Sequence, residues 1–243
     1  MTIAFPPDKI LVFYTPAHGF IHKILIAAFE AGIWDKLTFV PIYPRRDGYY
    51  INAINPLAKV PTIALPDGTV LYGSQTIVEY FDSFNTTSPL YPASGTARWD
   101  ALRRLGLADI TFDVTTRVCY EHTLKTPNAE VVEWNWPKLV RALDQMDKDA
   151  ASLTGFDIGQ AATLHAVSYL EWHMTNTVGL LPPVPKAYDW RIGRPALKAW
   201  WDKAIQRPSV QNHFQKTYVG DTSVEYAQAA IQHVLDLQQA RKG

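Results

Sequence analysis

Residues 1–85 alternate between the hydrophobic patterns that distinguish strands from helices. Ile10 to Tyr14 is an unbroken run of apolar, β-forming residues, which predicts a strand buried on both faces. Leu37 to Tyr43 predicts a second strand, whereas 44–56 has no clear period and predicts a loop with one short helix. Between the two strands a helix that ends near Gly32 is predicted, because apolar residues recur every three or four positions: Ile21, Ile24, Leu25, Ala28 and Phe29.

The segment that follows predicts a hairpin and one more helix. Two short apolar runs, Thr62 to Leu65 and Thr69 to Tyr72, flank a turn that contains Asp67-Gly68, a pattern typical of an antiparallel hairpin. Ser74 is the expected N-cap of the helix after it. The buried stripe of this helix is expected to consist of Ile77, Val78 and Phe81. The order β-α-β followed by β-β-α predicts an α/β domain with a mixed four-stranded sheet.

A segment dense in Pro, Ser, Thr and Gly separates this region from the rest of the chain. It covers about 86–96 and predicts a linker between a first domain at 8–85 and a second at 97–243. Strand patterns disappear after it, so the second domain is expected to be an all-α helical bundle. Its predicted helices cover about 97–122, 131–151, 158–175, 195–206 and 223–240.

Composition narrows the possible partners. The 23 Lys and Arg residues balance 23 Asp and Glu residues, so neither nucleic acid nor an anionic membrane surface is indicated as a partner. Cys119 is the only cysteine, which excludes an internal disulfide and a CxxC redox pair, and no histidine spacing predicts a metal site. No stretch approaches the roughly 20 apolar residues of a membrane span, and Met1 to Lys9 lacks an apolar signal core. A soluble, cytoplasmic protein is the expectation.

Two motifs in the first domain resemble the glutathione-site signature of glutathione transferases. They are Asn55 to Pro61 (NPLAKVP) and, after the hairpin turn, Leu71 to Tyr80 (LYGSQTIVEY). The resemblance continues in the second domain at 158–171 and 189–209, and covers about 9–215 in all. It implies a thioredoxin-like first domain, an all-helical second domain, and glutathione as co-substrate with no metal.

The resemblance also implies roles for single residues. In the family the bond that matches Val60-Pro61 is cis, which turns the Val60 main chain toward the cysteinyl backbone of glutathione. Ser74 at a helix start is expected to hold the γ-glutamyl carboxylate, since helix N-termini favour anions. Lys59 is expected to reach the glycyl carboxylate. Gly73 departs from the family, which usually carries an acidic or amide residue there.

Three residues are candidates for the group that activates the glutathione thiol. An alignment without gaps from Lys23 to Gly32 puts His18 where serine-type members carry the catalytic hydroxyl and Tyr14 where tyrosine-type members carry theirs. Thr15 offers a third hydroxyl. The sequence leaves the choice among the three open. The turn that follows the first predicted strand contains no cysteine, which argues against cysteine-dependent chemistry.

The substrate and the assembly are implied only in outline. The acceptor pocket for a small hydrophobic electrophile is expected near Phe112, Arg117, Tyr120 and Trp172, and the resemblance implies a homodimer. The favoured function is attack of the activated thiolate on that electrophile, and the alternative is a non-catalytic binding or regulatory protein with the same fold. The amphipathic segment at about 223–240 is expected either to close over the acceptor pocket or to pack on the second domain.

Overall fold

The computed structural model describes residues 3–15, 20–176, 183–185, 188–211 and 221–242. The chain divides into two compact units, and each is described by itself. The sheet unit comprises Met1–Leu90 together with Gln211–Gly243, and the helical unit comprises Tyr91–Val210.

The sheet unit contains a mixed four-stranded sheet, as expected. Its strands are β1 (Ile10–Tyr14), β2 (Leu37–Pro41), β3 (Thr62–Ala64) and β4 (Val70–Tyr72), in the order β2-β1-β3-β4. β1 runs parallel to β2 and antiparallel to β3, and β3 runs antiparallel to β4. The parallel pair is joined through a helix and the antiparallel pair by the Asp-Gly turn, which confirms the β-α-β and β-β-α order.

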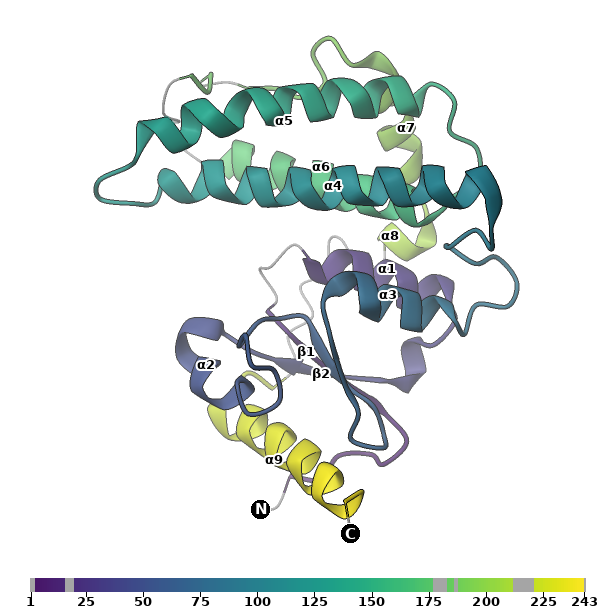
Figure 1. The fold of residues 1–243 in the computed structure, drawn as a ribbon, viewed down its shortest axis with the longest axis vertical. Coiled ribbons are helices and arrows are strands. Elements are labelled where there is room, and N and C mark those ends of the chain that lie inside the picture. Colours follow the sequence, from purple (N-terminus) through teal and green to yellow (C-terminus); the bar gives the residue numbers. More distant parts are fainter. Residues whose placement is uncertain (1–2, 16–19, 177–182, 186–187, 212–220, 243) are drawn as a thin grey trace. The chain divides into compact units, whose positions relative to one another are not determined.

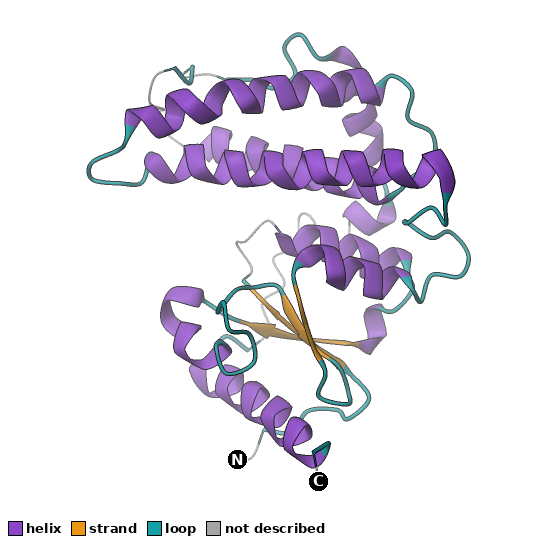
Figure 2. Ribbon diagram, viewed as in Figure 1, coloured by secondary structure: helices purple, strands orange, loops and turns teal. Residues whose placement is uncertain are grey.

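Helices cover both faces of this sheet (Figures 1 and 2). Helices α1 (Phe20–Glu30) and α3 (Ser74–Asp82) pack against each other on one face. Helices α2 (Pro44–Ile51) and α9 (Val224–Ala240) lie on the other, and a short 3-10 helix (Trp34–Lys36) precedes β2. Every residue of β1 is buried, as its continuous apolar run predicts, because the central strand has helices on both sides.

The position of α9 differs from the expectation, which assigned 97–243 to one helical domain and let the last helix pack on that domain or close over a pocket. In the structure, α9 belongs to the sheet unit and packs against α2 and β2. The physical reason is its apolar stripe, which completes the hydrophobic core that the sheet forms with α2. The buried residues of this stripe are Ala227, Ala230, Ile231 and Val234.

The helical unit is built around its longest helix. Its helices are α4 (Gly95–Glu121), α5 (Ala129–Ala150), α6 (Ile158–Asn176) and α7 (Pro195–Ala204), with the short α8 (Pro208–Gln211) at the unit boundary. α4 packs against both α5 and α6, and α5 packs against α7. Gly159 lets α4 and α6 approach closely, because a Cβ there would lie 2.6 Å from the Ala101 carbonyl oxygen. Within the described parts of the chain, no helix is both long and apolar enough to cross a membrane.

Candidate functional site

The segment Asn55 to Pro61 enters the middle of the sheet. Pro61 immediately precedes β3, which has neighbours on both sides, and the Val60-Pro61 bond is cis, as the resemblance implies. None of the turn and loop hydrogen bonds found among the described residues uses the Val60 N–H or C=O. The main chain of Val60 is therefore available to an extended ligand that pairs with it as a strand would.

Asn55 holds this segment in place, a role that the sequence analysis did not assign. Its side-chain amide donates to the Lys59 carbonyl at 3.0 Å and to the Thr62 hydroxyl at 2.9 Å, and its side-chain oxygen accepts the Leu57 N–H at 3.0 Å. The Thr62 hydroxyl in turn donates to the Lys59 carbonyl at 2.8 Å. Asn55 and Thr62 are buried, so these bonds fix the backbone on both sides of Val60-Pro61. In the sequence, the signal that could have indicated this role is an asparagine between apolar residues.

The start of α3 lies at the same edge of the sheet, and one detail of it corrects the sequence analysis. Ser74 is the first helical residue and not the N-cap, which is Gly73. Gly73 has φ +87°, in the left-handed region that favours glycine. The first bond within the helix runs from the Ile77 N–H to the Gly73 carbonyl, so the N–H groups of the first turn point out of the helix end.

The sheet register brings three candidate positions to one edge of the sheet. Phe13 pairs with Thr62 across β1 and β3, and Thr62 pairs with Tyr72 across β3 and β4. Both pairings are antiparallel. Thr15 follows β1, Val60 lies two residues before Thr62, and Ser74 lies two residues after Tyr72, so all three are at the same end of these strands. The end of β1, the Val60-Pro61 segment and the α3 N-terminus therefore meet at one edge of the sheet.

The three thiol-activating candidates differ in what the structure says of them. Tyr14 is only 2% exposed, and its ring meets Phe39 edge-on at a centroid distance of 5.6 Å. The partly buried Thr15 donates its hydroxyl proton to the Ile42 carbonyl. His18 lies outside the described residues. Of the two described side chains, Thr15 follows the end of β1 at the edge that carries Val60 and Ser74, while Tyr14 is part of the core.

The residues expected at the acceptor pocket lie on two helices of the helical unit, and their surroundings differ. Phe112 is 2% exposed and packs on the His165 ring at 4.8 Å, so it is a core residue of this unit. Arg117 is exposed and pairs with Asp113 at 2.8 Å. Tyr120 and Trp172 are 50% and 55% exposed. Phe112 is therefore enclosed in the core, whereas the other three side chains are exposed.

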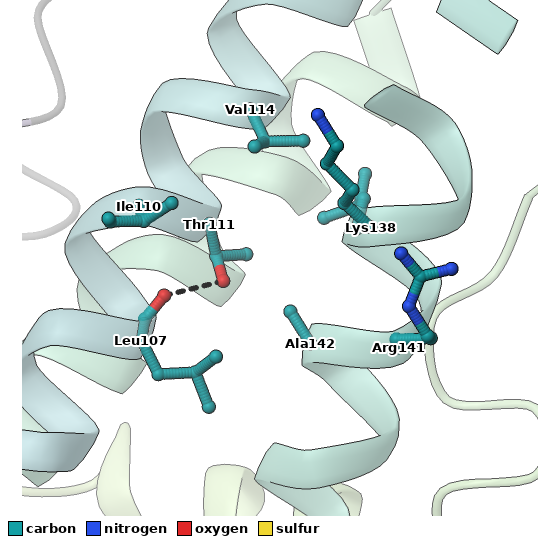
Figure 3. A pocket seen from close by; sticks show the side chains of 8 residues that line it. Leu107, Ile110, Thr111, Val114, Lys138, Arg141 and Ala142 are labelled. Atoms are coloured by element: carbon teal, nitrogen blue, oxygen red, sulfur yellow. Dashed lines mark hydrogen bonds between the residues drawn. The ribbon is translucent and has the colours of Figure 1, made fainter. Parts of the chain in front are cut away.

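A groove does lie elsewhere on this unit, between α4 and α5 (Figure 3). It has a volume of about 290 Å³, and Lys138 and Arg141 are the charged side chains among its lining residues. The Thr111 hydroxyl turns back to donate to the Leu107 carbonyl at 2.7 Å, which leaves its methyl group for the groove. The other lining residues are Ile110, Val114, Leu139 and Ala142.

The only cysteine takes no part in a reactive site. Cys119 is buried in α4, and this burial raises the pKa of its thiol to about 12, so it carries no thiolate at neutral pH. Over the residues that the structure describes, no cluster of three or more His, Cys, Asp or Glu side chains is arranged to hold a metal ion.

Comparisons with known proteins agree with this fold. Residues 19–83 match the family described as glutathione S-transferase, N-terminal domain. The chain is similar to the crystal structure of a glutathione transferase family member from Pseudomonas fluorescens Pf-5 with bound glutathione, at 28% identity and a TM-score of 0.73, over 84% of this chain and 98% of that one. It is also similar to a glutathione S-transferase from Methylobacillus flagellatus KT with glutathione bound, at 25% identity and a TM-score of 0.74, over the same shares of the two chains. No curated protein sequence matches the chain.

Proposed function

Since this chain belongs to the glutathione S-transferase family, we propose that its sheet unit binds glutathione and that the protein transfers the glutathione thiolate to a small hydrophobic electrophile. The observation that carries the proposal is that the end of β1, the cis Val60-Pro61 segment before β3 and the start of α3 after β4 meet at one edge of the sheet. A tripeptide with two carboxylates and an extended backbone matches this edge, which offers main-chain groups beside a helix N-terminus.

Each part of the edge has a role toward glutathione. The Val60 N–H and C=O pair with the cysteinyl backbone, and the Asn55 network holds them in position. Ser74 and the N–H groups of the first α3 turn bind the γ-glutamyl carboxylate, because charge-assisted hydrogen bonds at a helix start are strong. Gly73 contributes only its backbone, and Lys59 binds the glycyl carboxylate.

The residues at the end of β1 are proposed to hold the thiol in its ionised form. A free thiol has a pKa of about 8.5, so a donor that lowers it by about two units supplies roughly 2.7 kcal/mol. The Thr15 hydroxyl donates to the Ile42 carbonyl and would have to rotate away from it to donate to sulfur. Tyr14 and His18 stay as the alternatives. Glutathione supplies the nucleophilic sulfur, and the leaving group departs from the electrophile with its electron pair.

A non-catalytic glutathione-binding protein is the second candidate function. It is favoured by the engagement of Thr15 with Ile42 and by the burial of Tyr14, since both described hydroxyl candidates are committed within the fold. Single substitutions separate the two functions: Thr15→Ala, Tyr14→Phe and His18→Ala are each assayed with a general electrophile. If one of them abolishes turnover while glutathione still binds, the protein is a transferase. If the unsubstituted protein binds glutathione without any turnover, the second function is correct.

Calorimetric titration with glutathione tests the binding site itself. We expect a dissociation constant in the micromolar to low-millimolar range, weakened about tenfold or more by Ser74→Ala, because a hydrogen bond to a charged group contributes about 1.5–3 kcal/mol. Ser83→Ala is the matched control, since Ser83 lies at the other end of α3 and only bonds the Tyr80 carbonyl. The absence of heat at several millimolar glutathione would refute the proposed site.

We also propose that the protein is a homodimer that uses the groove between α4 and α5. Ile110 lines this groove and is 66% exposed, so a second subunit seated on the groove would bury its apolar side chain. Sedimentation of the unsubstituted protein is expected to give a dimer, and Ile110→Lys a monomer. Ile192→Lys is the control, because Ile192 is 75% exposed and does not line the groove. An unchanged dimer in Ile110→Lys would exclude this face.

A further inference from the structure

We propose that α9, the last helix of the chain, is a positioning element of the glutathione site, because it holds both flanks of the Asn55 to Pro61 segment. This inference rests on the proposed glutathione binding. One flank is α2, which leads into the segment, and the other is the β3–β4 hairpin, which follows it and leads to Ser74. α9 contacts both.

The middle of α9 shares one hydrophobic cluster with the site segment. Its buried residues Ala230, Ile231 and Val234 belong to the same cluster as Ile54 and Val60. Phe5 joins the cluster and packs on Tyr226 of α9 at a centroid distance of 5.3 Å. Since Val60 offers its main chain to the ligand, the side of Val60 that faces away from glutathione is supported by a core that α9 completes.

The N-terminal end of α9 is tied to α2. The Arg46 guanidinium donates to the Thr222 carbonyl at 3.0 Å, just before the Ser223 side chain caps α9 by accepting the Tyr226 N–H at 3.1 Å. Arg46 also pairs with the buried Asp47 at 2.6 Å. The Asp47 carboxylate accepts the N–H of Tyr43, the residue before α2, at 2.8 Å. The start of α2 and the start of α9 are thus joined through Arg46.

The C-terminal end of α9 is tied to the turn of the β3–β4 hairpin. A Cβ on Gly68 would lie 2.9 Å from the Leu237 Cβ and 3.0 Å from the Gln238 N, so the turn and the helix touch backbone to backbone. The Gln238 side-chain amide donates to the Gly68 carbonyl at 3.2 Å, and Arg241 reaches Asp67 at 3.3 Å. The Asp-Gly turn therefore serves as the contact point for α9 as well as reversing the chain.

Together these contacts couple α9 to glutathione. If α9 detaches, α2 and the hairpin turn lose both their apolar contacts and their hydrogen bonds to this helix. The segment from Asn55 to Pro61, which lies between them, can then unfold locally. A ligand that needs this segment in one conformation then binds less tightly, because part of its binding energy is used to close it. α9 contributes none of the residues proposed to bind glutathione, and its effect on the ligand passes through the hydrophobic cluster and the segments that it holds.

The test compares two buried isoleucines. Ile231→Ala removes apolar contacts beneath the site, whereas Ile158→Ala makes the same change in α6 of the helical unit. Both changes are expected to destabilise the protein to a similar extent, because each leaves a cavity in a hydrophobic core. Hydrogen exchange of the ligand-free proteins is measured over 44–61, and the dissociation constant of glutathione is measured by calorimetry.

We expect faster exchange over 44–61 only in Ile231→Ala, and glutathione binding weakened about fivefold or more only in that variant, as for sites coupled by 1–3 kcal/mol. Arg241→Ala, an exposed change that leaves the core intact, is expected to shift both readouts the same way but less. Unchanged exchange over 44–61, or an equal loss of affinity in Ile158→Ala, overturns the role of α9. If the unsubstituted protein binds no glutathione, the proposed function fails, and the exchange experiment still decides whether α9 holds this segment.

Discussion

The two faces of the sheet are covered in different ways. The face under α1 and α3 is closed by helices that alternate with the strands along 20–82. The other face is closed by α2 and by α9, whose Gln238 bonds to Gly68 across 170 positions of the sequence. The first face can form from local sequence, whereas the second is complete only when the C-terminal segment has docked. The proposed glutathione site therefore depends on the face that needs the C-terminal segment for its completion.

The largest effect is expected from a charge placed in each face. Val78 in α3 and Val234 in α9 are both fully buried, and a buried carboxylate without a partner destabilises by about 3 kcal/mol or more. We expect Val78→Asp to unfold the sheet unit, but Val234→Asp to release α9 and leave β1 and β3 protected from hydrogen exchange. Equal loss of protection in β1 and β3 in both variants would show that the two faces fold as one.

A smaller effect is expected where the hairpin meets α9. Gly68 and Gly32 both have positive φ, but only Gly68 has α9 backbone close to its missing Cβ, and Gly32 has nothing within 4 Å. Gly32→Ala should cost about 1–2 kcal/mol through its backbone conformation alone, and Gly68→Ala about 1–3 kcal/mol more through the clash. Chemical denaturation measures both. Equal losses of stability in the two variants would mean that α9 moves away from the added methyl group at no cost in free energy.

The hydrogen bonds of Asn55 beside Val60 test whether the loss of binding is specific to the site. Asn55→Ala removes the amide donors to Lys59 and Thr62, and Asn85→Ala removes a buried amide that donates to the Ser88 carbonyl at 2.7 Å, away from the site. Each loss is expected to cost about 1–3 kcal/mol of stability. Only Asn55→Ala should also weaken glutathione binding, as calorimetry can determine. A similar loss of affinity in Asn85→Ala would point to a general loosening of the unit.

The smallest effect is expected at the exposed end of α9. The pKa of Asp67 is lowered mainly by hydrogen bonds from the Thr69 backbone and hydroxyl, with a further contribution from Arg241. A carboxyl with a lowered pKa stabilises the fold above its unfolded pKa of about 3.9, and this contribution is lost as the pH falls through the folded value. Arg241→Ala should therefore cost no more than about 1 kcal/mol at pH 7, and less below the folded pKa of Asp67, where only the hydrogen bond from Arg241 to the Thr69 hydroxyl remains. Thermal denaturation at several pH values measures the difference, and a cost that does not fall in acid would assign it to packing.

Much of the site was predictable because its signals are local. The short apolar runs, the Asp67-Gly68 turn and the motif from Asn55 to Pro61 are carried by neighbouring residues, and the structure has the mixed sheet and the cis Val60-Pro61 bond that they imply. The roles of single residues were harder to predict from the sequence. Ser74 was expected to be the N-cap, but Gly73 is, because the backbone turns there through a positive φ that residue preferences alone did not reveal.

The sequence by itself determined the elements whose periodicity depends on nearby residues: the strands, the helices and the order in which they alternate. Only the tertiary structure decided which surface each apolar stripe covers. The stripe of α9 is the same whether it packs on the sheet or on other helices, and Phe112 has the same spacing in a pocket as in the core. Periodicity states that a face must be buried, but the partner is chosen by contacts between segments far apart in the chain.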